Sequence, residues 1–171
     1  MQTNMNLTVA FKGGQKMNGV AMYDNNSGIR TIGGIVSDDN TLDAEFGLAV
    51  FAPAASIADL IVGKSVTMTS PIFRGLLLGN SGIRENMPAR ASSYLRGSPA
   101  TAVYFGALWY DTIVREDGTT AAAVGDLLSI QDTTGKVFTR VTTAGTGFTA
   151  IPGSVVEVAG GSTAIFIDGN V

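Results

Sequence analysis

Short apolar segments rich in β-branched and aromatic residues recur along the chain, and turn-forming residues follow each of them closely. Examples are LTVAF (7–11), TIGGIV (31–36), PIFRGLLLG (71–79) and TAVYFGALWY (101–110). Such segments at a spacing of roughly 8–12 residues are typical of antiparallel sheets, because parallel strands need long crossover connections. The sequence therefore predicts an all-β fold: an antiparallel β-sandwich or barrel-like domain with long loops.

Three predicted hairpins carry the clearest local signals. In each, a short glycine-containing turn separates two segments with strand-like patterns, as tight antiparallel turns require. The turn sequences are Asn18-Gly19, TTGK (133–136) and GGS (160–162). The predicted hairpins join residues 7–11 to 20–23, 123–132 to 137–143, and 154–159 to 163–168.

The middle of the chain is less regular. Two further strands are predicted at residues 47–52 and 64–69. The piece between them, residues 53–62, is the best candidate for a short helix, because three of its large apolar residues would share one helical face. Residues 80–100 lack clear periodicity, so we expect a long loop there.

The segment TAVYFGALWY contains the chain's only tryptophan and is apolar on both sides. In a regular strand successive side chains point to opposite faces. One face would then carry Val103, Phe105, Ala107 and Trp109, and the other Tyr104, Leu108 and Tyr110. Neither face is polar, which predicts a strand that is covered on both sides. A loop of the same chain or a second subunit would provide the outer cover, and in the second case Trp109 or Tyr104 would help to bury the subunit interface.

The balance of apolar and charged residues narrows the class of protein. Hydrophobic residues make up 45% of the chain and charged residues only 15%, against the roughly 25% usual for globular domains. Much of the surface is therefore expected to be covered by a partner, as in an obligate oligomer or an assembly subunit. A small monomer with a surface rich in alanine and glycine is the alternative. A net charge of −3 gives no electrostatic footprint for nucleic acid. Without histidine or cysteine the chain lacks the usual general base and any zinc–thiolate site.

No linker divides the chain. Residues 1–30 are predicted to form an N-terminal arm or hairpin that packs on or extends from the main domain, and residues 31–171 a single β-rich domain. The N-terminus lacks the apolar core of a signal peptide. The longest apolar run, residues 46–63, is interrupted by Pro53 and Asp59 and could not cross a bilayer as a helix. We therefore expect a protein that is not exported by a standard signal and does not associate with membranes.

Two short segments resemble nucleotide-binding motifs but lack the features that bind phosphate. Residues 63–65 (GKS) match the end of a P-loop, yet the phosphate cradle needs a glycine where the chain has Ala58. GTGFTA (145–150) matches a dinucleotide-binding pattern, but Pro152 follows where a helix should begin. A glycine-rich turn between strands is the simpler interpretation.

The acidic segment SDDNTLDAE (37–45) does not have the ligand spacing of a calcium loop, so a solvated loop is favoured over a metal site. Lys64 and Ser65 would point to opposite faces of a strand and could not form a catalytic pair. The sequence predicts no enzymatic activity, no cofactor and no metal.

The most uneven charge lies between residues 74 and 96, where four arginines have only Glu85 as a local acid. The arginines are Arg74, Arg84, Arg90 and Arg96. Together with Tyr94 they would suit docking on the carboxylates of a partner, since guanidinium groups bind carboxylates through two parallel hydrogen bonds. The alternative is a solvated loop whose arginines pair with the acidic segment 37–45.

The order of several segments resembles the cement or decoration proteins of tailed-phage capsids. The segments are AEFGLAVF (44–51), PIFRGLLLG (71–79), YLRGSPATAVYFGALWYD (94–111) and IPGSVVEVAGGSTAIFID (151–168). The resemblance covers roughly residues 30–168 and rests on pattern and order. It implies a β-rich protein that binds the capsid shell between capsomers, usually as a dimer or trimer, and reinforces the expanded head. It implies no catalytic residues.

These observations predict a non-enzymatic structural protein on the capsid exterior of a virion, made in the host cytoplasm. Its expected partners are the major capsid protein and further copies of itself, as a homodimer or homotrimer. The candidate interface residues are Arg74, Arg84, Arg90, Tyr94, Arg96, Tyr104 and Trp109. Another virion protein of a tail or fibre is the nearest alternative. A carbohydrate-binding sandwich that uses Trp109, Tyr110 or Tyr104 as a stacking platform is the alternative from a different class.

Overall fold

The computed structural model describes residues 19–21, 28–64, 67–79 and 93–169, and in this part of the chain the fold is all-β, with no helix. The prediction of an all-β, barrel-like domain is confirmed. The strands are β1 (Val20–Ala21), β2 (Arg30–Val36), β3 (Ala44–Glu45), β4 (Ala49–Ala52), β5 (Asp59–Val62), β6 (Ile72–Leu77), β7 (Ser93–Tyr94), β8 (Pro99–Asp111), β9 (Leu127–Gln131), β10 (Val137–Arg140), β11 (Phe148–Ala159) and β12 (Ser162–Asp168).

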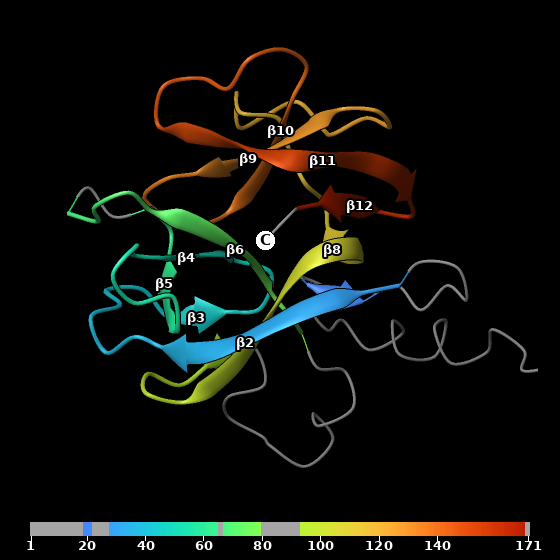
Figure 1. Cartoon of the computed structure of the whole chain (residues 1–171). Helices are drawn as coiled ribbons and strands as arrows, with labels where there is room; N and C mark the ends of the chain where they lie inside the picture. The colour runs from blue at the N-terminus through green and yellow to red at the C-terminus, as the bar shows by residue number, and fades with distance from the viewer. Residues whose placement is uncertain (1–18, 22–27, 65–66, 80–92, 170–171) are drawn as a thin grey trace, which may run out of the picture.

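Five strands close into a small barrel in the order β2, β5, β4, β6, β8, with β8 returning to β2 (Figure 1). All neighbours are antiparallel except β2 and β5, which run parallel. The barrel is therefore mixed, whereas the turn spacing favoured purely antiparallel pairing. The parallel pair is short, and the chain between its two strands contains β3 and β4, which provide the crossover that parallel strands need.

The barrel interior is filled by one hydrophobic cluster, called here the barrel core. Its members alternate along the barrel strands with residues that face outward, as strand geometry requires. Leu60 and Val62 on β5 show this alternation, and Tyr94 from β7 packs partly against the cluster. The buried members are Val36, Ala44, Val50, Leu60, Val62, Leu77, Ala100 and Ala102.

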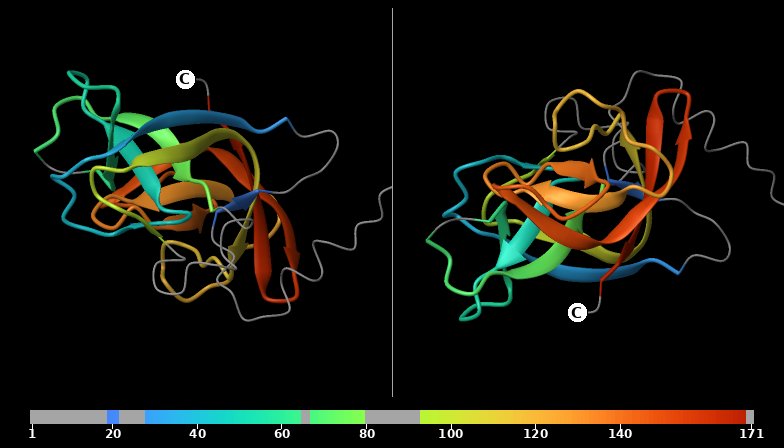
Figure 2. Two further views of the ribbon diagram at one scale, coloured as in Figure 1. Left: turned by 90° about the horizontal axis from the view of Figure 1, so that it is seen from below. Right: turned by 90° about the horizontal axis from the view of Figure 1, so that it is seen from above.

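The same sheet continues past the barrel at β8, and this part packs on the outside of the barrel. It contains the C-terminal half of β8 followed by β12, β11, β9 and β10, all antiparallel, and lies above the barrel in Figure 1. The predicted hairpins at residues 123–143 and 154–168 are confirmed as β9–β10 and β11–β12. We call this unit the C-terminal sheet. Figure 2 shows the two layers from either side.

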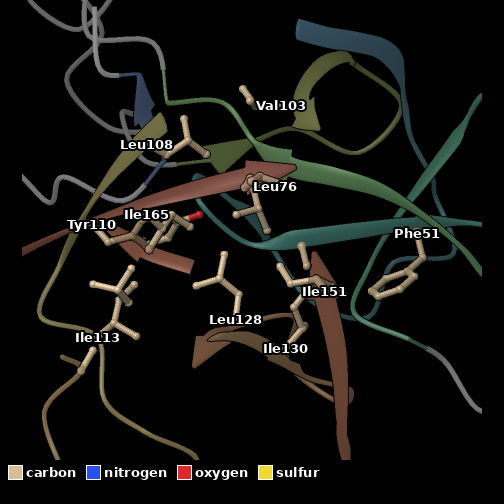
Figure 3. Packing of buried hydrophobic residues seen from close by; sticks show 14 residues of the cluster. Phe51, Leu76, Val103, Leu108, Tyr110, Ile113, Leu128, Ile130, Ile151 and Ile165 are labelled. Carbon is tan, nitrogen blue, oxygen red and sulfur yellow. The ribbon is translucent and has the colours of Figure 1, made fainter. Parts of the chain in front are cut away.

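The layer between barrel and C-terminal sheet holds a second cluster, called here the interlayer core. Figure 3 shows side chains from both layers gathered in it. The barrel wall contributes Ala49, Phe51, Leu76 and Val103. The other layer contributes Leu108, Tyr110, Ile113, Ala122, Leu128, Ile130, Ile151, Val155, Ile165 and Ile167. Each large side chain buried here stabilises the fold by about 1.5–3 kcal/mol.

Strand β8 belongs to both layers and is covered on both sides in the barrel wall, as predicted. Ala102 faces the barrel core, and Val103 faces the interlayer core. The cover comes from this chain's own C-terminal sheet. The predicted faces are correct from Phe105 to Tyr110 but wrong for Val103, because a bulge leaves Tyr104 unpaired with β2 and reverses the alternation there. Val103 therefore lies on the side of Leu108 and Tyr110.

Two local predictions in the middle of the chain were wrong. Residues 53–62 form no helix; they contain a turn followed by β5, because Leu60 and Val62 are held inside the barrel core at a spacing of two. The described residues of the predicted strand 64–69 lie in turns and bends rather than in a strand. Most of the predicted hairpin around Asn18-Gly19, and residues 80–92 of the predicted loop, lie outside the described residues.

Candidate interaction surfaces

Arg74 is the candidate residue with the most unusual surroundings. It lies on β6 at a bulge, since Val50 pairs with Gly75 and Phe51 with Phe73, which leaves Arg74 without a residue opposite it on β4. Only 8% of its surface is exposed. No described residue offers its Nε a hydrogen-bond partner. A guanidinium that is removed from water without full hydrogen bonding lowers the stability of the fold. The burial of Arg74 is therefore unfavourable for folding and points to another role for this residue.

Tyr94 packs against the barrel core. Its hydroxyl donates a hydrogen bond to the Leu78 carbonyl oxygen at 2.9 Å, and its ring meets the Phe46 ring edge-on at 5.2 Å between centroids. Burial raises the pKa of the Tyr94 hydroxyl above its ordinary value. These contacts occupy the polar and apolar parts of the side chain. Tyr94 is therefore placed as a packing residue of the barrel, with its ring only partly exposed.

Arg96 follows β7 and is exposed. The β3–β7 pair brings this region against the acidic segment 37–45: Ala44 pairs with Tyr94, and the Gly97 N–H donates to the Val36 carbonyl oxygen at 2.8 Å. The two segments meet through backbone hydrogen bonds. No ion pair joins Arg96 to the acidic segment within the described residues.

Trp109 lies on the outer side of the C-terminal sheet, in one row with Glu157 and Ala164. The same side carries Phe105 and Phe166, whose rings meet edge-on at 5.2 Å. We call Phe105, Trp109 and Phe166 the outer aromatic face. All three are partly exposed, and the small residues between them, Ala107 and Ala164, are buried.

Tyr104 and Tyr110 do not join the outer aromatic face as a stacking platform. Tyr104 lies in the bulge of β8, where its carbonyl oxygen accepts a hydrogen bond from the Gly169 N–H at 2.9 Å. Tyr110 points into the interlayer core, and its hydroxyl donates to the Gly47 carbonyl oxygen at 2.8 Å. Burial raises the pKa of the Tyr110 hydroxyl well above its ordinary value. The suggestion that Tyr110 offers an exposed surface to a sugar was wrong.

The candidate interface residues are therefore dispersed. Arg74 lies in the barrel wall, Tyr94 and Arg96 lie at β7, and Tyr104 and Trp109 lie on β8. Arg84 and Arg90 lie outside the described residues. The structure does not bring the described members together into one site.

A polar cluster that sequence analysis missed fixes the loop between β8 and β9. The Arg115 guanidinium donates to both carboxylate oxygens of Asp126, at 2.8 and 3.0 Å. Asp126 also accepts hydrogen bonds from the Ala123 N–H and the Thr139 hydroxyl. The hydrogen bonds from Arg115 hold the pKa of Asp126 below its ordinary value. Since Arg115 also bridges to Thr139 on β10, the cluster attaches this loop to the edge of the C-terminal sheet.

An open cleft of about 240 Å³ lies between the β3–β4 connection, the end of β8 and strand β10. Glu45, Asp111 and Lys136 are among the residues that line it. Within the described ranges no three acidic side chains gather closely enough to hold a metal ion.

Large apolar side chains are exposed on both layers. Those on the barrel are Ile35, Ile57, Ile72 and Leu95, and those on the C-terminal sheet and its loops are Val124, Leu127, Val141, Val156 and Val158. By contrast, Arg115–Asp126 is the salt bridge found within the described residues. In the same part of the chain, no helix is long and apolar enough to cross a membrane.

Comparison with known proteins assigns the chain to no family. No protein-family model matches the chain, and no curated protein matches its sequence.

Proposed function

We propose that the protein is a non-enzymatic structural protein that binds the outside of a phage capsid between capsomers and stabilises the expanded head. It acts by burying surface across neighbouring major capsid subunits. It is made in the host cytoplasm and functions in the virion. The proposal needs no cofactor, metal ion or nucleic acid.

The observation that carries the proposal is the set of exposed large apolar side chains in a chain of low charge. Among the described residues, nine large apolar side chains are at least 40% exposed, and they are spread over both layers. Single exposed apolar residues are common, but together with a charged content of 15% they leave little of the surface strongly hydrated. A surface of this kind suits a protein whose working state is an assembly.

A shell-binding protein gains strength from repetition. Each contact with the shell can be modest, because several contacts made by one oligomer act together. A fold in which one long strand, β8, runs through both layers is suited to transmit load between those contacts, since its backbone is hydrogen-bonded to β2 and β6 in the barrel and to β12 in the C-terminal sheet.

The burial of Arg74 is a second observation that supports the same proposal. A buried, incompletely paired guanidinium lowers the stability of the free protein, and a carboxylate of a capsid subunit that reaches it would remove the penalty. In this account Arg74 is a docking residue that is satisfied only on the shell.

Co-sedimentation with expanded, undecorated heads of the source phage tests the proposal. Saturable binding at a fixed ratio to the major capsid protein is expected. Two variants with paired aspartate substitutions divide the surface: Ile57→Asp with Leu95→Asp on the barrel, and Val124→Asp with Val141→Asp on the other layer. All four positions are exposed, so both variants should fold.

One of the paired variants should weaken head binding while the other, with the same change in charge, serves as its matched control. If the folded protein, with its oligomer mass known, showed no saturable binding, the proposal would be refuted and the search would turn to tail or fibre assemblies.

The sugar-binding alternative is tested separately, because Trp109 is the only tryptophan and its fluorescence would change if a saccharide stacked on it.

A further inference from the structure

The end of β11 has one hydrogen-bonding edge without a neighbour. On one side Glu157, Val158 and Ala159 pair with β12, and Val156 lies in a bulge without a residue opposite it. On the other side β9 begins at Leu127, opposite Ser154. The turn before β9 reaches only as far as Val155, through hydrogen bonds of 2.9 Å with Gly125 and Asp126. No described residue pairs with Val156–Ala159 on that side. We call these four residues the free edge.

The free edge is exposed and largely apolar. All four residues are exposed, with 45% exposure at both Val156 and Val158. Figure 2 shows the end of the β11–β12 hairpin, in red, at the side of the molecule. Edge strands of monomeric proteins are commonly protected by lysine or proline, and this edge contains neither; its one charged residue is Glu157. An edge of this kind accepts an additional strand.

The hairpin geometry determines which backbone groups face outward. Gly160 and Gly161 have φ angles of 58° and 83°, as a two-residue type I′ turn requires. In such a hairpin the flanking pair, Ala159 and Ser162, exchanges hydrogen bonds directly. Because the direction of these groups alternates along a strand, the N–H and C=O of Val158 point away from β12 and toward the free edge.

We propose that the free edges of two copies pair antiparallel about a two-fold axis at Val158, which joins the two C-terminal sheets into one continuous sheet. The proposal concerns the protein free in solution and does not depend on head binding. It names a second copy of this chain as the partner, and two-fold pairing of identical edges is the simplest closed assembly.

The side-chain pattern selects this register. Val158 lies in one row with Thr163 and Tyr110, on the core side of the sheet, whereas Glu157 lies in the row of Trp109 on the outer side. Pairing centred on Val158 keeps each side chain on its own face and places Glu157 opposite the second copy's Ala159. Pairing centred on Glu157 would place two carboxylates opposite each other, which is unfavourable.

The edge is short, so the dimer should be weak and its population should depend on concentration. Sedimentation equilibrium from roughly 10 μM to 1 mM should show a monomer–dimer transition. Val158→Lys should shift the transition to higher concentration by at least about tenfold, because it places two ammonium groups opposite each other. Val141→Lys, at a more exposed valine away from the edge, is the matched control and should leave the transition unchanged.

The register is tested with single cysteines, since the chain has none. Paired residues of the expected type have Cα atoms about 5.5 Å apart, within the range that a disulfide spans. Val158→Cys should therefore form a disulfide dimer under mild oxidation much faster than Val141→Cys. Glu157→Cys should also be slow, because its counterpart is Ala159 of the second copy. Thermal unfolding of each variant confirms that it is folded.

Three outcomes would overturn the inference. The first is a wild-type protein that remains monomeric up to 1 mM, with Val158→Cys crosslinking no faster than Val141→Cys. The second is a dimer that Val158→Lys leaves intact and Trp109→Ala disrupts, since the outer aromatic face would then hold the copies together. The third is a monomer whose binding to heads is lost in Val158→Lys, because the edge would then receive a strand of the shell.

Discussion

Val103 and Leu108 project into the same hydrophobic core, although an odd number of positions separates them along β8. In a regular strand they would point to opposite faces. The bulge at Tyr104 removes the mismatch, so that the first half of the strand serves the barrel and the second half serves the C-terminal sheet. The bulge therefore lets both halves of β8 direct apolar side chains into the interlayer core.

The first prediction concerns Gly75, which lies next to the bulge of β6, the barrel strand that pairs with β8. Gly75 has a φ of 135°, and an added Cβ would lie 2.4 Å from the Val103 carbonyl oxygen. Gly75→Ala should therefore lower the free energy of unfolding by about 3 kcal/mol, measured by urea denaturation. Gly118→Ala is the matched control, because its φ of 78° is also positive but the added Cβ meets nothing within 4 Å. It should cost about 1 kcal/mol, and equal losses in the two variants would argue against the close approach of β6 and β8.

Neighbouring leucines on β9 provide a second prediction about the interlayer core. Leu128 is fully buried in it, whereas Leu127 is 40% exposed on the opposite side of the strand. Leu128→Ala should lower the free energy of unfolding by about 2–5 kcal/mol, and Leu127→Ala by less than about 1 kcal/mol. Urea denaturation of both variants measures the difference. Similar losses would mean that the C-terminal sheet does not pack on the barrel in this register.

The predictable parts of the fold were those that local sequence specifies. The β9–β10 and β11–β12 hairpins follow from glycine turns between alternating segments. The apolar character of residues 101–110 correctly indicated burial on both sides where β8 forms the barrel wall, but Phe105 and Trp109 lie partly exposed on the outer side of the C-terminal sheet. The predictions that were wrong concerned segments whose structure depends on contacts with residues far away in the sequence. Residues 59–62 have a pattern that also suits a helix, and only the closure of the barrel around Leu60 and Val62 makes them a strand.

The candidate sites were less predictable, because they depend on which segments become neighbours. Sequence identified Arg74 as a cation in an acid-poor region but could not show that a bulge would bury it. Arg115 and Asp126 lie 11 positions apart in unremarkable loops, and their ion pair forms only when β10 is paired with β9. The one available signal was the turn at Asp117-Gly118, which reverses the chain between them.

A third prediction follows from the burial of Arg74. Arg74→Met replaces a poorly paired buried cation with an apolar side chain of similar length, so the free energy of unfolding of the isolated protein should rise by about 1 kcal/mol or more. Binding to heads should become weaker in the same variant. Arg96→Met, at an exposed arginine, is the control and should change stability by less than about 0.5 kcal/mol. A marked loss of stability in Arg74→Met would mean that the remaining guanidinium nitrogens have strong partners.

The Arg115–Asp126 pair predicts how stability depends on pH. Hydrogen bonds from Arg115 lower the pKa of Asp126 in the folded protein, so the ionised carboxylate contributes stability above the ordinary aspartate pKa of about 3.9. This contribution should be lost as the pH falls through the lowered folded-state pKa. At pH 6, Asp126→Asn should therefore be less stable than wild type, and the difference should shrink steadily below about pH 4.

Urea midpoints of wild type and Asp126→Asn, measured between pH 2 and pH 7, test this directly. Asp39→Asn, at an exposed carboxylate of the acidic segment, is the matched control and should follow the wild-type curve at every pH. A second variant, Arg115→Met, should reproduce the flattened pH dependence of Asp126→Asn, since removing either partner removes the cause of the lowered pKa. If the wild-type and Asp126→Asn midpoints instead stayed a constant distance apart down to pH 2, the ion pair would not be what holds the β8–β9 loop against β10.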